Sequence, residues 1–336
     1  MGGHIYRCAD CNTEKPIYNS CRNRHCPKCQ ASATAKWLEA RSSELLPVPY
    51  FHVVFTTPHE LNGITLQNKE ILLDILFKAS SRAMQEVAKR NLEGELGFFS
   101  VLHTWGQKLE FHPHVHCVVP GVILKDDGSI KKTKQGYLLT QRKLSVVFRS
   151  IFIKLLVKAF QKEKLKFYGE QTEDGFWQLV KEIKAKEWVA YAKKPFAGSA
   201  AVLKYLSRYT HKVAISNSRI IKTEGDTVSF SYKDYSDNCA KKTLSIKTVE
   251  FVRRFLLHTL PEQFVRIRYF GSLSSAKKTN FLARVRSAIG SAIDKIKVLA
   301  KSCCPECGST SFFKSHEIKS SFTSQAHHNK SLPKVA

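Results

Sequence analysis

The stretch EFHPHVHCVVPG, residues 110–121, places three histidines at alternate positions. Successive side chains of a β-strand point to opposite faces, so His112, His114 and His116 would project from one face of a sheet. The apolar, β-branched run that follows favours a strand that reaches into a core. Three imidazoles on one face are more than packing requires, so this strand is the first candidate for a metal site.

Strands and helices are mixed around this stretch. Apolar and β-branched runs predict strands at 50–58, 96–106 and 112–124, and helical apolar spacing predicts helices at 72–90 and 143–165. The other expected elements are helices at 31–46, 175–186, 199–212, 246–260 and 276–298, strands at 187–195 and 264–271, and a hairpin at 218–234. Because strands and helices do not strictly alternate, the sequence predicts an α+β fold and not a doubly wound sheet.

The composition indicates a polyanionic partner. The 336 residues include 54 Lys and Arg against 28 Asp and Glu, a formal net charge of +26 that is spread along the chain. Nucleic acid is the first partner suggested by such an excess, and an anionic membrane surface is the second. The sequence has no apolar run of about 18 residues and begins without the apolar core of a signal peptide, so we expect a cytoplasmic protein.

Two Cys-x2-Cys pairs near the amino terminus suggest a zinc site. Cys8 and Cys11 are followed, after 14 intervening residues, by Cys26 and Cys29. In a reducing cytoplasm such pairs favour metal ligands over disulfides. Structural zinc takes four tetrahedral ligands, so we expect these four thiolates to hold one Zn²⁺ and to supply the folding energy of a small module.

The remaining cysteines and histidines near the two termini have less defined roles. Cys21 and His25 lie within the first cysteine segment and could replace a ligand, hold a second ion or only pack. Cys304 and Cys307 form one further pair, and a closed second site there would need His316 or another histidine of the tail. The Ser-, Lys- and His-rich tail itself is expected to be disordered.

Three interpretations of the histidine strand remain open. The imidazoles could be solvent-facing, could belong to a zinc hydrolase, or could hold a divalent cation that polarises a phosphodiester. No His-Glu-x-x-His pair supports the hydrolase. Two imidazoles on one face leave coordination positions for phosphate oxygens, which favours the cation. For the third ligand Gln107, His112 and His103 compete, and spacing alone does not decide between them.

A second candidate pattern is KYLSRYTHK, residues 204–212. Tyr205 and Tyr209 are four positions apart and would share one face of a helix. Two aromatic residues at this spacing are ordinarily core residues, but here Lys204, Arg208 and Lys212 surround them. A tyrosine hydroxyl can act as a nucleophile on phosphorus, and the neighbouring cations would then hold phosphates of DNA.

Taken in order, these features resemble rolling-circle insertion-sequence transposases of the "ninety-one" family. The resemblance rests on RNRHCPKCQ at 22–30, PYFHVVFTTPHEL at 49–61, HPHVH at 112–116 and YLSRY at 205–209. It extends to about residue 275. Four motifs in one order are far more specific than any single one of them.

The resemblance implies a histidine–hydrophobic–histidine (HUH) endonuclease of the two-tyrosine class. Its core would be a central antiparallel sheet flanked by helices. His114 and His116 would ligate Mg²⁺ or Mn²⁺, with Gln107 as the third ligand. Tyr205 and Tyr209 would cleave single-stranded DNA at element ends, leaving a 5′-phosphotyrosine and a free 3′-OH. Such an enzyme would work at the nucleoid of a bacterium.

Four segments are expected along the chain. They are a zinc-binding module at 1–35, the nuclease at 48–235, a helical, basic region at 236–300, and a cysteine knuckle with a disordered tail at 301–336.

Two other functions remain open. A plasmid-type rolling-circle replication initiator would use the same chemistry, although the sequence has no phosphate-binding loop of a fused helicase. Members of the family usually have a helical segment before the zinc module, which this chain lacks. A truncated, non-catalytic zinc-dependent DNA-binding protein is therefore the second alternative.

Overall fold

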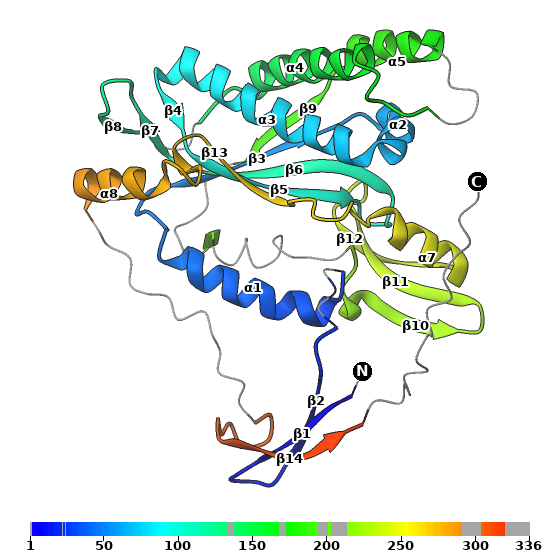
Figure 1. Cartoon of the computed structure of the whole chain (residues 1–336). Coiled ribbons are helices and arrows are strands. Elements are labelled where there is room, and N and C mark those ends of the chain that lie inside the picture. Colours follow the sequence, from blue (N-terminus) through cyan, green and yellow to red (C-terminus); the bar gives the residue numbers. More distant parts are fainter. Residues whose placement is uncertain are drawn as a thin grey trace, which may run out of the picture.

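The strand that carries the three histidines is β6 (Phe111–Pro120), and it lies in the middle of a five-stranded antiparallel sheet. The order of the strands is β13-β5-β6-β3-β9 (Figure 1). The other four strands are β13 (Ile267–Phe270), β5 (Phe98–Trp105), β3 (Tyr50–Thr56) and β9 (Val189–Lys193). This computed structural model describes residues 2–21, 23, 25–133, 138–167, 173–193, 201–202, 214–290 and 304–319. The predicted α+β class with a central antiparallel sheet is confirmed.

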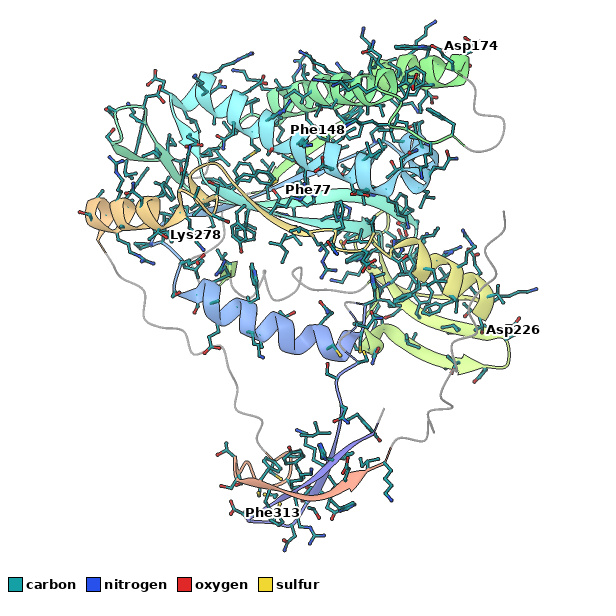
Figure 2. All side chains as sticks on the ribbon, in the orientation of Figure 1. Phe77, Phe148, Asp174, Asp226, Lys278 and Phe313 are labelled. Atoms are coloured by element: carbon teal, nitrogen blue, oxygen red, sulfur yellow. The ribbon has the colours of Figure 1, made fainter. Side chains whose placement is uncertain are left out.

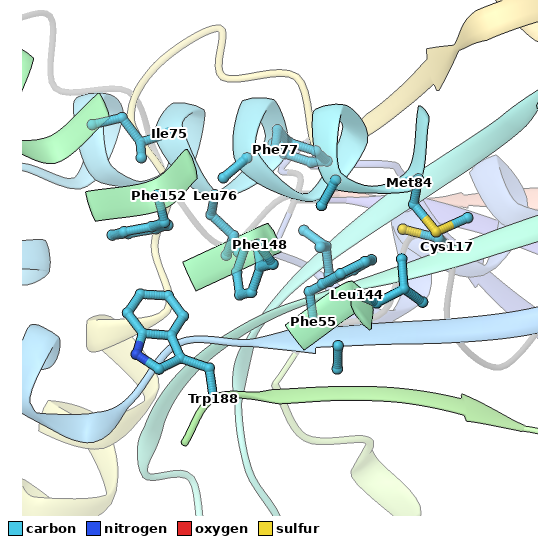
Figure 3. Close-up of a cluster of buried hydrophobic side chains, with 14 of the residues drawn as sticks. Phe55, Ile75, Leu76, Phe77, Met84, Cys117, Leu144, Phe148, Phe152 and Trp188 are labelled. Atoms are coloured by element: carbon cyan, nitrogen blue, oxygen red, sulfur yellow. The ribbon is translucent and has the colours of Figure 1, made fainter. Parts of the chain in front are cut away.

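Helices cover one face of this sheet. They are α2 (Asn62–Gln67), α3 (Lys69–Leu92), α4 (Gln141–Gln161) and α5 (Glu173–Ala185). On α3 the residues Leu73, Leu76, Phe77 and Met84 recur at helical spacing and are buried. Figure 3 shows Leu76, Phe77 and Met84 in one core with Phe148 of α4 and other aromatic residues. Full burial of each such side chain contributes about 1.5–3 kcal/mol.

The opposite face of the sheet carries the histidines and a second, smaller core. Even-numbered residues of β6 and odd-numbered residues of β5 point to this side, because side chains alternate along a strand. Val101 and Val118 pack there with residues of α1 (Pro27–Ser42) and α8 (Lys278–Ile289). Figure 1 shows α1 on the side of the sheet opposite α3 and α4.

Two further three-stranded sheets flank the central one. The first has the order β10-β11-β12 and packs against α7 (Thr248–Leu257), and the second has the order β4-β7-β8. Their strands are β10 (Ile220–Glu224), β11 (Thr227–Asp234), β12 (Ala240–Lys247), β4 (Glu95–Leu96), β7 (Val122–Leu124) and β8 (Ile130–Lys132). Three short 3-10 turns complete the described fold at His59–Leu61, Asn217–Arg219 and Gly271–Leu273.

The two ends of the chain form a separate small sheet. Its order is β14-β1-β2, with β1 (Gly3–Cys8), β2 (Glu14–Tyr18) and β14 (Phe312–Ile318). β1 is the central strand and pairs antiparallel with both neighbours. Figure 2 shows that this sheet, where Phe313 is labelled, carries its own side chains apart from the main body.

Three sequence expectations differ from the structure. The tail after the last cysteine pair was expected to be disordered, but β14 is an ordered strand because its backbone pairs with β1. The helix expected at 246–260 begins only at Thr248, because residues 240–247 form β12, whose register with β11 is continuous. The central sheet also extends past the predicted boundary at residue 235, since β13 is its edge strand beside β5.

None of the described helices is both long enough and apolar enough to cross a membrane.

Candidate active site and cysteine sites

The β5–β6 hairpin brings three histidines together on one face of the central sheet. His103 of β5 lies directly opposite His114 of β6, and the next pair on this face joins Val101 to His116. One ring nitrogen from each of His103, His114 and His116 lies within 4.8 Å of the others. Ligands about 2.1 Å from one ion can be separated by at most about 4.2 Å, so a small contraction would let all three share it.

Hydrogen bonds determine which nitrogen of His114 is available. Its Nδ1 lies 2.7 Å from the carbonyl oxygen of His112. A carbonyl only accepts, so Nδ1 carries the proton and donates it. In the neutral ring Nε2 then keeps its lone pair and can act as a metal ligand.

His116 has a histidine partner from the neighbouring strand. Its Nδ1 lies 2.8 Å from Nε2 of His52 on β3, and both side chains are buried. If His116 ligates an ion through Nε2, its Nδ1 is protonated and donates to His52 Nε2. A metal-bound histidine is usually held by such a second hydrogen bond, which sets its tautomer and its ring orientation.

Burial disfavours the protonated form of two imidazoles of this face. Burial lowers the pKa of His114 to about 4 and lowers that of His112 as well. Uncharged rings are the form that binds cations. The indole of Trp105 stacks on His103, with ring centroids 4.6 Å apart, and so limits the orientations of that ring.

Neither Gln107 nor His112 belongs to the histidine group. The side chain of Gln107 accepts a hydrogen bond from the backbone N–H of Lys233 and donates one to the hydroxyl of Tyr235. It lies in the turn between the two strands, past a register shift that follows His103. The structure therefore favours His103, the rival candidate, as the third ligand and not the predicted Gln107.

The predicted nucleophiles and their basic neighbours lie outside the described residues. This applies to Tyr205 and Tyr209 and equally to Lys204, Arg208 and Lys212. The residues on either side of that segment are described. Val202 is fully buried in the core that contains Val101 and Val118, on the histidine-bearing face. Ala214 is buried beside Trp105 in a third cluster, which adjoins the same face.

The four cysteines predicted to share one zinc ion are not brought together. Cys8 and Cys11 lie with Cys304 and Cys307, and all four Sγ atoms are within 4.8 Å of one another. Sulfur–sulfur contacts between the two pairs include Cys8–Cys307 at 3.6 Å and Cys11–Cys304 at 3.4 Å. The reason is the pairing of β1 with β14, which brings the last cysteine pair to the first.

Cys26 and Cys29 belong to a second group with Cys21. Their Sγ atoms also lie within 4.8 Å of one another, at the start of α1. The hydroxyl of Ser20 lies 3.2 Å from Cys29 Sγ and contributes most to lowering the pKa of that thiol to about 6. Structural zinc takes four ligands, and the described residues supply three here. His25 lies in neither group and instead lines a small cavity with Thr104 and His258.

Two roles were missed at the level of sequence. His52 sits in the strand FHVVFT, where the odd-numbered neighbours are core residues and nothing local shows that an even-numbered histidine faces His116. For Cys304 a signal was present. CADCNT at 8–13 and CPECGS at 304–309 share the pattern Cys-x-acidic-Cys-(Asn/Gly)-hydroxyl, and CPKCQA at 26–31 does not.

Comparison with known proteins assigns the class of this molecule. Residues 97–280 match the family described as "Putative transposase", and residues 1–57 match a "Transposase zinc-binding domain". The first match contains β5, β6 and β13, and the second contains Cys8, Cys11 and the Cys21 group. The fold and its sites therefore define a transposase with a zinc-binding domain.

Two relatives identify the family. "Putative transposase y4qJ" of Sinorhizobium fredii is 45% identical over 300 residues, which span 87% of this chain and 75% of the relative. The transposase for insertion sequence element IS801 of Pseudomonas savastanoi pv. phaseolicola is 28% identical over 293 residues, or 86% of this chain and 70% of that protein. The chain belongs to the "ninety-one" family of insertion-sequence transposases, as its motifs suggested.

Solved structures of the conjugative relaxase TrwC in complex with oriT DNA resemble the chain weakly. One aligns with 73% of this chain and 72% of its own, with a TM-score of 0.25 and 11% identity. The fold assignment therefore rests on the strand order given above.

Proposed function

We propose that this transposase nicks and rejoins single-stranded DNA at the ends of its insertion sequence, through a covalent bond between a tyrosine and a 5′-phosphate. The observation that carries the proposal is the group of His103, His114 and His116 on a sheet face where Val202 and Ala214 hold both flanks of the tyrosine segment. This arrangement supports a reaction in which Tyr205 or Tyr209 attacks a phosphate of DNA bound next to the three histidines.

The three imidazoles fit a divalent cation. Each can offer an uncharged nitrogen, and burial of His114 disfavours the protonated form that would repel the ion. When bound, the cation would neutralise a non-bridging oxygen of the scissile phosphate. Because Mg²⁺ prefers oxygen ligands whereas imidazole suits transition metals, this donor set favours Mn²⁺ over Mg²⁺.

The tyrosines would carry out a transesterification. The hydroxyl oxygen of Tyr205 or Tyr209 attacks phosphorus, and the bond between phosphorus and the 3′-oxygen breaks. The tyrosine proton passes to solvent, and the leaving 3′-oxygen takes up a proton and becomes a free 3′-OH. The phosphotyrosine keeps the energy of the broken ester, so rejoining by a 3′-OH needs no ATP. Two tyrosines allow two such cleavages in one site.

His52 would act as a positioning residue for His116. Its Nε2 accepts the proton of His116 Nδ1 in this scheme, and the two rings are stacked with an interplanar angle of 17°. This contact would fix the tautomer in which Nε2 of His116 keeps its lone pair for an ion.

Charge supports DNA as the partner. The net charge of +26 favours a polyanion, and the sheet β10-β11-β12 carries exposed lysines at positions 222, 233, 241 and 247. Lys204, Arg208 and Lys212 would hold phosphates next to the cleavage point. The relative from Pseudomonas savastanoi pv. phaseolicola is the transposase for insertion sequence element IS801, which is consistent with this substrate.

We place the proposed nuclease unit between about residue 48 and the end of β13 at Phe270, because this strand completes the sheet beside β5. The zinc-binding module at 1–35 precedes it.

Incubation of the full chain with single-stranded oligonucleotides from the element ends and Mn²⁺ or Mg²⁺ tests the proposal. We expect a protein–DNA adduct that survives boiling in detergent, is lost on nuclease treatment and forms faster with Mn²⁺ at equal low concentration. Double-stranded DNA of the same sequence is the control. Cleavage without any covalent adduct would exclude the tyrosine mechanism.

A further inference from the structure

The two ends of the chain meet in one small sheet. β1 pairs with β14 over six residue pairs, from Gly3 opposite Ile318 to Cys8 opposite Phe312. One more backbone hydrogen bond joins Ala9 N to the carbonyl of Ser311 at 3.0 Å. The match to a zinc-binding domain covers residues 1–57 and includes none of the carboxy-terminal partners.

The two cysteine loops of this sheet have the same local geometry. In the first loop Cys8 N donates to the carbonyl of Thr13, at 2.9 Å, and Asn12 N donates to that of Cys8, at 3.1 Å. The corresponding bonds in the second loop run from Cys304 N to Ser309 O, at 2.7 Å, and from Gly308 N to Cys304 O, at 2.9 Å.

Each loop also turns through a left-handed residue, Asn12 at φ 58° and Gly308 at φ 74°. Asn and Gly are the residue types that adopt this conformation most readily. In both loops the backbone N–H of the second cysteine is directed at the sulfur of the first. Two loops that each direct an N–H at a sulfur are suited to hold thiolates.

The sheet has no hydrophobic core of its own. Among the described residues at 2–20 and 304–319, only Gly3, Cys8 and Cys304 are buried. Its larger apolar side chains are exposed, such as Tyr18 at 53% and Phe313 at 49%. A unit of this size without a core needs a metal or disulfides to hold its fold.

We propose that Cys8, Cys11, Cys304 and Cys307 form one closed zinc site that fastens the carboxyl end of the chain to its amino end. Four thiolates about 2.3 Å from a tetrahedral zinc ion lie about 3.8 Å apart. The sulfur–sulfur contacts of 3.6 Å and 3.4 Å are close to that spacing. Binding displaces the thiol protons, and the zinc ion supplies folding free energy in place of the missing core.

Zinc content of the full chain and of paired variants tests this site. The variants are Cys8→Ser with Cys11→Ser, Cys304→Ser with Cys307→Ser, and all four together. Because the two pairs share one ion, each double variant should lose one equivalent of zinc, and the fourfold variant should lose no more than either. Cys239→Ser, at an exposed cysteine outside both groups, is the control and should keep the full content.

Two results of this experiment would overturn the site. One is full zinc content in the Cys304→Ser, Cys307→Ser variant, which would leave the first pair with other ligands. The other is a loss of two equivalents in the fourfold variant, which would mean that each pair binds its own ion.

Disulfide mapping of the unmodified chain provides a second test that does not depend on a variant folding. When the zinc-loaded chain is oxidised briefly without prior chelation, so that the thiolates are oxidised in place, peptides that contain Cys8 or Cys11 should be linked to peptides that contain Cys304 or Cys307. Links from the first pair to Cys26 or Cys29, with none between the two ends, would overturn the proposal. Both tests are independent of DNA cleavage, so their outcome is separate from that of the nuclease function.

Discussion

The histidine group and the group of Cys8, Cys11, Cys304 and Cys307 are assembled in opposite ways. His103 and His114 come from two strands joined by a short hairpin, so their separation in the chain is small. The two cysteine pairs lie at the two ends of the chain and meet because β1 pairs with β14. In the first case a local pattern already contains most of the site, and in the second each local pattern contains only half of it.

This difference explains which sites can be recognised from spacing. A His-x-His pair in a strand fixes two ligands on one face, because side-chain direction depends only on the alternation of the backbone. A Cys-x2-Cys loop fixes two ligands and leaves the other two to tertiary structure. With several such loops in one chain, the sequence alone allows more than one pairing.

The largest expected effect comes from removing a ligand of the histidine group. His114→Ala or His116→Ala should reduce cleavage about a thousandfold or more, because several kcal/mol of charge stabilisation are lost and each 1.36 kcal/mol is about tenfold in rate. DNA binding, measured by fluorescence anisotropy, should stay close to wild type since the net charge is unchanged. His112→Ala, on the same strand but outside the group, is the matched control. Cleavage at the wild-type rate by His114→Ala or His116→Ala would show that the substituted histidine does not hold a catalytic metal ion.

A smaller effect distinguishes the two candidates for the third ligand. His103→Ala should weaken Mn²⁺ binding by about a hundredfold, measured by titration calorimetry, since one of three nitrogen ligands is lost. Gln107→Ala should leave Mn²⁺ affinity near wild type and cost only about 1 kcal/mol of stability, because its hydrogen bonds go to Lys233 and Tyr235. If Gln107→Ala weakened Mn²⁺ binding more than His103→Ala did, Gln107 would be the third ligand.

The contact between His52 and His116 should have a weaker but measurable influence. His52→Phe keeps a ring but removes the acceptor, and we expect Mn²⁺ affinity and cleavage to fall about 10–100-fold. His52→Gln can accept from His116 Nδ1 through its amide oxygen and should recover part of the loss. Equal Mn²⁺ affinity in the phenylalanine variant and the wild type would show that His52 only packs.

The smallest effect concerns how the stability of the folded chain depends on acid pH. Burial lowers the pKa of His258 to about 4 from an ordinary value of 6.5. Between these two values the unfolded chain binds a proton that the folded chain does not, so stability is lost as the pH falls through this window. We expect the titration of this residue alone to lower the free energy of unfolding by about 2 kcal/mol between pH 6.5 and pH 5. Urea unfolding at both pH values should show a smaller loss of stability on acidification in His258→Gln than in the wild type. An equal loss in both proteins would show that His258 is not the group that titrates.

Much of the fold follows from local patterns. The alternation in β6, the apolar spacing of α3 and the hairpin of β10 and β11 are each properties of a few neighbouring residues, and all three elements lie where the sequence predicted them. β12 was missed because its side chains are mostly exposed or half-buried, which leaves little apolar alternation to recognise.

The parts that could not be predicted depend on contacts between distant segments. The sequence of β14, FFKSHEI, has no apolar alternation and its side chains are mostly exposed, so it forms a strand only because β1 offers it an edge. The same holds for His52, whose partner His116 is 64 residues further along the chain. The grouping of His103 with His114 depends on the register of β5 against β6, which pairs these two residues and leaves Gln107 in the turn.

Peptide mapping of the protein–DNA adduct tests the central claim most directly. Trypsin cleaves after Lys204, Arg208 and Lys212, so Tyr205 and Tyr209 fall on separate peptides, YLSR and YTHK. The account predicts that the residual nucleotide is attached to one or both of these peptides, and that the double change to phenylalanine removes all adduct. A nucleotide on any other peptide, or an adduct that survives the double change, would contradict it.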